Sequence, residues 1–376
     1  EFISYLKLRT SYTEVGSPIT QTGITPGTVT DPMSGGVINP ISTYPYPDFK
    51  PERTKSYEVG INARFLNGRI SFDGTFYQSN TYNQTFLSVM SPATGYSGFY
   101  VQAGNVRNRG VEMTLGYNDT FGKVNYSTHL TYTANQNKIV EMVHDYRNPI
   151  DNSLVNITEL TLKEAGDVYL REGYSMSDVF TTGILQRGRD GKLVEEGNGY
   201  QVDRSQRIRL GSADPDFTMG WRHDINYKNI SLGLMITGRF GGIVTSQTQA
   251  FMDAFGVSKV SAEARDNGGV MLDGHRYDAE RYYNTVGGQG LMSYYTYDAT
   301  NVRLQELSLT YSLPKKWLGD VFNNATISFV GRNLFMFYRK APFDPDMNGS
   351  TGTYNRSDFF MAPSLRNLGF SIKFSL

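Results

Sequence analysis

Apolar and polar side chains alternate along several stretches of the chain. Between residues 54 and 66, for example, Tyr57, Val59 and Ile61 are separated from one another by polar or small residues. A period of two indicates a β-strand with one apolar face and one polar face. The same alternation predicts ten strands, near residues 3–14, 54–66, 70–76, 111–117, 124–132, 217–227, 230–240, 301–313, 325–338 and 366–376.

The connections between these strands are alternately short and long. Asn67-Gly68 is a strong hairpin signal, because both residues accept a positive φ. An outer-membrane barrel has short periplasmic turns and long outward loops, whereas a soluble sandwich has no reason to keep every second loop short. The long connections are expected at 15–53, 77–106, 134–216, 241–300 and 339–365, with irregular structure.

One strand carries a local break in the alternation. Its apolar positions change parity between Leu304 and Leu307. One extra residue in a strand shifts every following side chain to the opposite face, so this break predicts a β-bulge.

Composition agrees with an all-β membrane protein. The chain of 376 residues holds 26 Tyr and 22 Phe, which favour strands and membrane interfaces. No run of apolar residues is long enough for a spanning helix, and the mean hydropathy of −0.41 would usually indicate a soluble protein. A barrel keeps its mean hydropathy low because polar residues face its lumen. We therefore predict an antiparallel transmembrane β-barrel.

Charge and motifs argue against several other classes of function. The formal charge is zero, with 36 basic and 36 acidic residues, so no nucleic-acid-binding surface is indicated. The chain has no cysteine, and its four histidines show no metal-ligand spacing. Asp344 to Gly349 begins like a calcium loop, but residue 355, where a bidentate Glu should stand, is Asn355. We expect no enzyme, no metal and no cofactor, and an ordinary turn at Asp344.

Six segments, spread over nearly the whole chain, resemble those of one family. They are LKLRTSYTEVG (6–16), KPERTKSYEVGINARFLNGRISFDGTFYQSNT (50–81), AGNVRNRGVEMTLGY (103–117), GSADPDFTMGWRHDINYKNISLGLMITGRFGG (211–242), YDATNVRLQELSLTYSLPKKWL (297–318) and GRNLFMFY (331–338). In this order they resemble the SusC/RagA family of TonB-dependent outer-membrane transporters of Bacteroidota.

The resemblance implies a 22-stranded barrel that is closed by an N-terminal plug and covered by a SusD-like surface lipoprotein. Residues 1–376 would correspond to about the last ten strands of that barrel, with the plug, the segment that contacts TonB and the signal peptide absent from this chain. The alternation alone would also allow a complete barrel of ten strands.

Aromatic residues in the long loops are the candidates for substrate contact. An aromatic ring can cover the apolar side of a sugar and also offer a hydroxyl. The alternative is that these rings pack the loops together or form an interfacial girdle. The candidates are Tyr44, Tyr46, Tyr96, Phe99, Tyr100, Tyr174, Tyr294 and Tyr295.

The last strand is a second candidate site. Phe370, Ile372, Phe374 and Leu376 share one face, which is typical of a signal for insertion into the outer membrane. A soluble protein can also end in this way when its last strand joins a sheet.

The leading hypothesis is import of oligosaccharides or oligopeptides through the outer membrane. The partners would be a SusD-like lipoprotein, TonB, membrane lipid and the substrate, without nucleic acid. The alternatives are a passive ten-stranded pore or adhesin, and a soluble β-rich carbohydrate-binding module. The sequence does not distinguish a glycan from a peptide.

Overall fold

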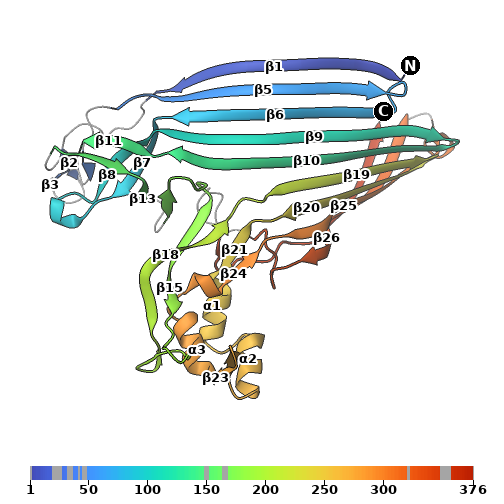
Figure 1. Cartoon of the computed structure of the whole chain (residues 1–376). Helices are drawn as coiled ribbons and strands as arrows, with labels where there is room; N and C mark the ends of the chain where they lie inside the picture. Colours follow the sequence, from blue (N-terminus) through green and yellow to red (C-terminus); the bar gives the residue numbers. More distant parts are fainter. Residues whose placement is uncertain are drawn as a thin grey trace. The chain divides into compact units, whose positions relative to one another are not determined.

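The computed structural model describes residues 2–18, 28–31, 37–40, 43–44, 49–147, 152–162, 168–319, 322–347 and 357–375. Ten long strands form one sheet in which the spatial order follows the order along the chain (Figure 1). All ten predicted strands are present. They are β1 (Ile3–Ser17), β5 (Glu52–Phe65), β6 (Ile70–Tyr82), β9 (Asn105–Phe121), β10 (Val124–Glu141), β19 (Phe217–Tyr227), β20 (Ile230–Phe240), β25 (Asn301–Ser312), β26 (Asn324–Arg339) and β28 (Asn367–Ser375).

The chain divides into two compact units. The first comprises Glu1–Asp119 with Ser127–Ser177, and the second comprises Thr120–Tyr126 with Asp178–Leu376. Each unit contains part of the sheet and the loops that connect its strands.

In the first unit, apolar side chains are aligned across the strands. Leu8 is opposite Ile61, Ile61 is opposite Gly74, and Gly74 is opposite Met113. Leu8 and Met113 are exposed. Because residues that are opposite one another project from the same face, these positions form an apolar row with no protein layer over it.

The other face of the first unit carries a polar network. Arg9 forms an ion pair with Asp73, in which Nη2 lies 2.6 Å from Oδ1, and it also donates to Thr75. Asn62 donates to the same carboxylate at 2.7 Å. Gly60 makes room for this arrangement, since a Cβ there would lie 2.5 Å from Nε of Arg9.

The second unit repeats the two-faced arrangement. Leu232, Leu309, Phe329 and Phe370 are directly opposite one another on four neighbouring strands. Leu309, Phe329 and Phe370 are exposed, and Leu232 is half-buried. An apolar row of this kind is what contact with lipid requires.

Polar side chains on the opposite face of the second unit pair with one another. Arg222 forms an ion pair with Asp224 at 2.9 Å and lies 3.8 Å from Glu306, which also pairs with Arg332 at 3.0 Å. On the apolar faces of the two units, five representative side chains are all at least partly exposed: they are Tyr57, Ile61, Phe72, Leu232 and Phe370.

The predicted turn and bulge are both present. Leu66, Asn67 and Gly68 have φ values of 51°, 57° and 86°, so the β5–β6 turn needs the left-handed conformations that Asn and Gly tolerate. The register of β25 shifts between Leu304 and Glu306 against β26, and β20 shifts at the same place.

The expectation of irregular loops is wrong, because the loops contain small sheets and helices. Apart from β18, which has 11 residues, these elements have at most eight residues, too few to give a clear periodic pattern. None of the helices in the described ranges is long and apolar enough to span a membrane. The loop elements are β2 (Thr28–Asp31), β3 (Val37–Pro40), β4 (Thr43–Tyr44), β7 (Gln84–Val89), β8 (Gly98–Ala103), β11 (Val143–Arg147), β12 (Leu154–Ile157), β13 (Glu159–Thr161), β14 (Tyr169–Arg171), β15 (Asp178–Leu185), β16 (Glu195–Glu196), β17 (Gly199–Tyr200), β18 (Val202–Ser212), β21 (Ile243–Ser246), β22 (Val270–Leu272), β23 (His275–Tyr277), β24 (Thr296–Asp298), β27 (Ser357–Asp358), and the helices α1 (Gln247–Ala254), α2 (Lys259–Asp266) and α3 (Ala279–Val286).

The acidic loop after β26 is held by an arginine. Nη2 of Arg303 lies 2.8 Å from Oδ1 of Asp344 and 2.5 Å from Oδ2 of Asp346, and the arginine side chain is only 6% exposed. Asn301 and Asn333 accept further hydrogen bonds from the same guanidinium. The two carboxylates that resembled the start of a calcium loop therefore bind a cationic side chain.

This ion pair makes the loop sensitive to acid. Burial alone would raise the pKa of Asp344, but hydrogen bonds from Ser364 and Arg303 outweigh it and lower the pKa below the ordinary 3.8. The ionised carboxylate therefore stabilises the loop above pH 3.8, and this contribution is lost as the pH falls through the folded-state pKa. We expect hydrogen exchange in residues 339–347 to be slower in the wild type than in Asp344→Asn at neutral pH. A difference between the two that persists undiminished well below pH 3.8 would contradict this assignment.

Candidate functional site

The connection between β20 and β25 leaves the sheet at two consecutive glycines. Gly241 and Gly242 have φ values of 74° and 76°, which side chains other than glycine rarely adopt. The connection returns beside its starting point, because β21 pairs with β24 and the Ala299 amide donates to the Gly242 carbonyl at 2.9 Å. Residues 243–298 thus form a closed structure on the end of the sheet.

The three helices in this connection begin at residues that cap them. The side chains of Ser246, Ser258 and Asp278 each accept a hydrogen bond from a backbone N–H in the first turn of α1, α2 and α3. Such caps satisfy donors that have no partner within the helix. Each helix has only eight residues, so capping and packing stabilise it more than helix propensity does.

Tyrosines form much of the core of this helical connection. In α3, Tyr282, Tyr283 and Val286 are buried, and Val286 lies four residues after Tyr282 and three after Tyr283, so both tyrosines share its side of the helix. They pack with Leu291 and Tyr295, which are also buried.

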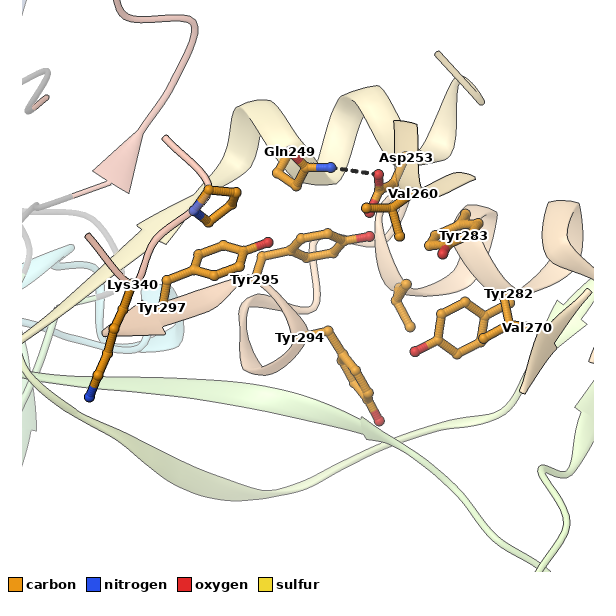
Figure 2. A pocket seen from close by; sticks show the side chains of 12 residues that line it. Gln249, Asp253, Val260, Val270, Tyr282, Tyr283, Tyr294, Tyr295, Tyr297 and Lys340 are labelled. Atoms are coloured by element: carbon orange, nitrogen blue, oxygen red, sulfur yellow. Dashed lines mark hydrogen bonds between the residues drawn. The ribbon is translucent and has the colours of Figure 1, made fainter. Parts of the chain in front are cut away.

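Beside this core lies a cavity of about 490 Å³. Figure 2 shows tyrosine rings around it, contributed by α3 and by the segment that leads into β24. A volume of this size is within the range of small-ligand pockets. Its tyrosines are Tyr282, Tyr283, Tyr294, Tyr295 and Tyr297, Gln249 and Asp253 add polar groups, and Lys340 also lines it.

Asp253 places a carboxylate in the wall of the cavity. The residue is only 5% exposed. Gln249 donates to its Oδ1 at 2.8 Å, and the Ser258 hydroxyl donates to the same oxygen. Both donors are neutral, and within the described ranges no basic side chain lies within 4.0 Å of this carboxylate.

Four tyrosine hydroxyls of the cavity, those of Tyr282, Tyr283, Tyr295 and Tyr297, remain uncharged at physiological pH. Burial raises the pKa of Tyr282, Tyr283 and Tyr295, and it raises that of Tyr297 to about 12. The nearby charge of Asp253 raises these pKa values further. The Tyr295 hydroxyl points towards Asp253 in Figure 2, yet it makes no hydrogen bond of normal geometry with any described group.

The ammonium group of Lys340, at the rim of the cavity, already has a partner. Nζ of Lys340 donates to Oδ2 of Asp298 at 2.6 Å, and in Figure 2 it points away from Asp253. Burial tends to raise the pKa of Asp298, but the hydrogen bonds from Lys340 and Thr300 lower it overall. Lys340 therefore contributes its carbon stem to the cavity.

The structure brings two of the predicted aromatic residues together here. Tyr294 and Tyr295 both line the cavity. The Tyr294 hydroxyl also accepts a hydrogen bond from the Leu185 amide, so this residue serves packing as well.

The remaining predicted aromatic residues lie in other loops and contact their neighbours. The rings of Tyr44 and Tyr96 are 5.2 Å apart, edge to face. Phe99 packs against Tyr146, Tyr100 against Phe49, and Tyr174 under the guanidinium of Arg171. Tyr46 lies outside the described residues. These contacts are compatible with the alternative of loop packing, and a role in substrate binding stays a prediction for all eight.

Sequence reasoning missed Asp253, Tyr282 and Tyr283. The available signal was Asp278, a capping residue, followed within five positions by two tyrosines. Such a pattern indicates the start of a short helix. Nothing in the sequence links it to Asp253 in another helix.

The proposed insertion signal lies on β28. Phe370, Ile372 and Phe374 are all exposed on one face of this strand, as their alternation predicts. Leu376 lies outside the described residues. Their role as a signal stays a prediction.

Comparisons with known proteins give a consistent result. The family described as "TonB dependent receptor-like, beta-barrel" matches residues 1–237. TonB-dependent receptor P3 of Formosa agariphila is 25% identical over 99% of this chain and 40% of its own length. TonB-dependent receptor P26 of the same organism is also 25% identical, over 80% of this chain and 32% of its own length. The chain thus spans less than half the length of these relatives.

Solved structures share the fold. The RagAB peptide transporter superimposes with a TM-score of 0.71 and 17% identity over 99% of this chain and 41% of that one. The RagAB peptide importer in the "open-open" state gives 0.69 and 18%, over 100% and 40%. The expected resemblance to transporters of the SusC/RagA type is confirmed, and the family consists of receptors and transporters rather than enzymes. The chain belongs to the TonB-dependent receptor β-barrel family, whose strands span the bacterial outer membrane.

Proposed function

We propose that the protein imports large nutrients, oligosaccharides or oligopeptides, across the outer membrane as a TonB-dependent transporter that works with a SusD-like lid lipoprotein. The observation that carries this proposal is the family match over a wall of strands with exposed apolar rows. The long connections of these strands carry aromatic loops, which supply surfaces for sugars and peptides alike. The similar RagAB protein is a peptide transporter, which supports a peptide cargo.

Uptake by cells tests the proposal. A strain that lacks the protein is compared with the complemented strain for uptake of labelled oligosaccharides and oligopeptides too large for general porins. We expect at least one cargo class to enter only the complemented strain, and its uptake to stop when a protonophore removes the energy supplied through TonB. Unchanged uptake of every cargo in the deletion strain would refute import. Uptake that depends on the protein but continues after protonophore addition would identify a passive pore.

Copurification tests the partner. We expect a surface lipoprotein to copurify with the full protein from outer membranes, and its deletion to reduce uptake of the same cargo. Normal uptake without any such lipoprotein would remove the lid from the proposal.

A further inference from the structure

We propose that the tyrosine cavity binds a cationic group, an ammonium or guanidinium carried on an apolar stem, as in the lysine or arginine side chain of a peptide. This inference names a ligand class for the proposed function. It rests on that function, because an imported peptide would be the source of the ligand. The residues that carry the inference are Asp253, Tyr282, Tyr294, Tyr295 and Tyr297.

The first argument is the missing counter-ion of Asp253. Buried carboxylates in proteins are usually paired with a cation or bind a metal, because desolvation of an unpaired charge is costly. Asp253 is 5% exposed, and the groups that hydrogen-bond it are neutral: Gln249 and Ser258 both donate to Oδ1, and the Tyr295 hydroxyl also interacts with the carboxylate. Within the described residues no group of three potential metal ligands occurs, so an organic cation fits the site better than a metal ion.

The second argument is the aromatic wall. The face of a tyrosine ring attracts a cation, and several rings around one carboxylate form a cage of the kind that holds alkylammonium groups. The Tyr295 hydroxyl, 3% exposed and without a hydrogen bond of normal geometry among the described residues, provides an acceptor for an N–H of the ligand.

The third argument is that two basic side chains near the cavity, within the described part of the chain, already have acidic partners. Lys340 lines the cavity, but its ammonium is bound to Asp298. Arg187, whose charge acts on Tyr282, is paired with Asp273 at 2.6 Å.

Binding to the full protein purified from outer membranes tests the inference. Three probes are compared by calorimetry: a lysine tripeptide blocked at both ends, the same peptide with acetyl-lysine, and n-butylamine. Because acetylation removes the positive charge and leaves the apolar stem in place, although it adds an acetyl group, we expect it to weaken binding at least about tenfold. Equal affinity for the two peptides would overturn the inference. Competition by n-butylamine that matches the lysine peptide would assign the site to a free amine rather than a peptide.

A variant locates the binding in the cavity. Asp253→Asn keeps an oxygen for Gln249 and Ser258 but removes the charge, so we expect about a tenfold loss for the lysine peptide and none for acetyl-lysine. Glu263→Gln is the matched control, since Glu263 is exposed in α2 and its ion pair with Lys259 lies on the helix surface. Hydrogen exchange in α1 and α2 confirms that the variant folds. An equal loss in both variants, or no loss in Asp253→Asn, would place the cation elsewhere.

The binding and uptake experiments test the two proposals separately, so one proposal can be refuted while the other is kept. Selective binding of the lysine peptide without uptake would refute import and keep the cation site. Uptake without selectivity for the charged peptide would keep import and refute the site.

Discussion

Replacing Arg303 by leucine should destabilise the loop that follows β26 by about 3 kcal/mol, the low end of the cost of removing one partner from a buried ion pair. The guanidinium is 6% exposed and binds Asp344, which is 11% exposed. Without it, the Asp344 carboxylate stays largely buried and loses its counter-ion. Hydrogen exchange in residues 339–347 of the full protein measures the change in the free energy of opening.

A neighbouring arginine provides the control for this experiment. Arg332 pairs with Glu306, but its side chain is 64% exposed. An exposed ion pair contributes about 0–1 kcal/mol, so Arg332→Leu should leave the loop almost unchanged. Equal effects of the two substitutions would show that burial of the Arg303 cluster does not determine the stability of the loop. Adding Asp344→Asn to Arg303→Leu should recover part of the loss, because the unpaired charge is removed.

Replacing Phe370 by arginine should reduce the stability of the barrel by about 2–4 kcal/mol, the cost of an arginine at the middle of a lipid-facing strand. Phe370 belongs to the exposed apolar row with Phe329 and Leu309. An arginine at position 370 must transfer its charged side chain from water into the hydrocarbon of the membrane. The yield of folded protein in outer membranes, and its unfolding in a denaturant series, measure the effect.

The adjacent residue is the matched control. Ser371 is also exposed on β28 but projects from the opposite face of the sheet. Ser371→Arg should therefore be tolerated, since polar residues face the lumen. If Ser371→Arg is as harmful as Phe370→Arg, the assignment of the two faces is wrong.

The wall of the protein could be predicted from its sequence because its determinants are local. Period-two alternation reports the environment on the two sides of a strand, and turn residues such as Asn67 and Gly68 fix where a strand reverses. The β25 bulge was also visible, because one extra residue changes the parity of Leu304 and Leu307. Loop elements such as α1 were not visible, because eight residues give too little periodicity and depend on packing.

The candidate site could be predicted only in part. Composition pointed to Tyr294 and Tyr295, since aromatic residues in long loops are plausible contacts. Asp253 and Tyr282 come from different helices, and only the folded connection brings them to one cavity. An isolated aspartate in a loop gives no sign that it will be buried, so the charge that defines the proposed ligand could not be found from the sequence.

The pairing of β21 with β24 has a consequence for how relatives can diverge. Since entry and exit of residues 243–298 are fastened side by side, this segment leaves and rejoins the sheet at one place, and its core also includes Leu185, Leu193 and Tyr200. Replacement by a segment of different length that fills the same core adds little closure entropy and leaves the register of β20 and β25 unchanged. The segment can therefore change in evolution, or be exchanged by grafting, without rebuilding the strands that carry it.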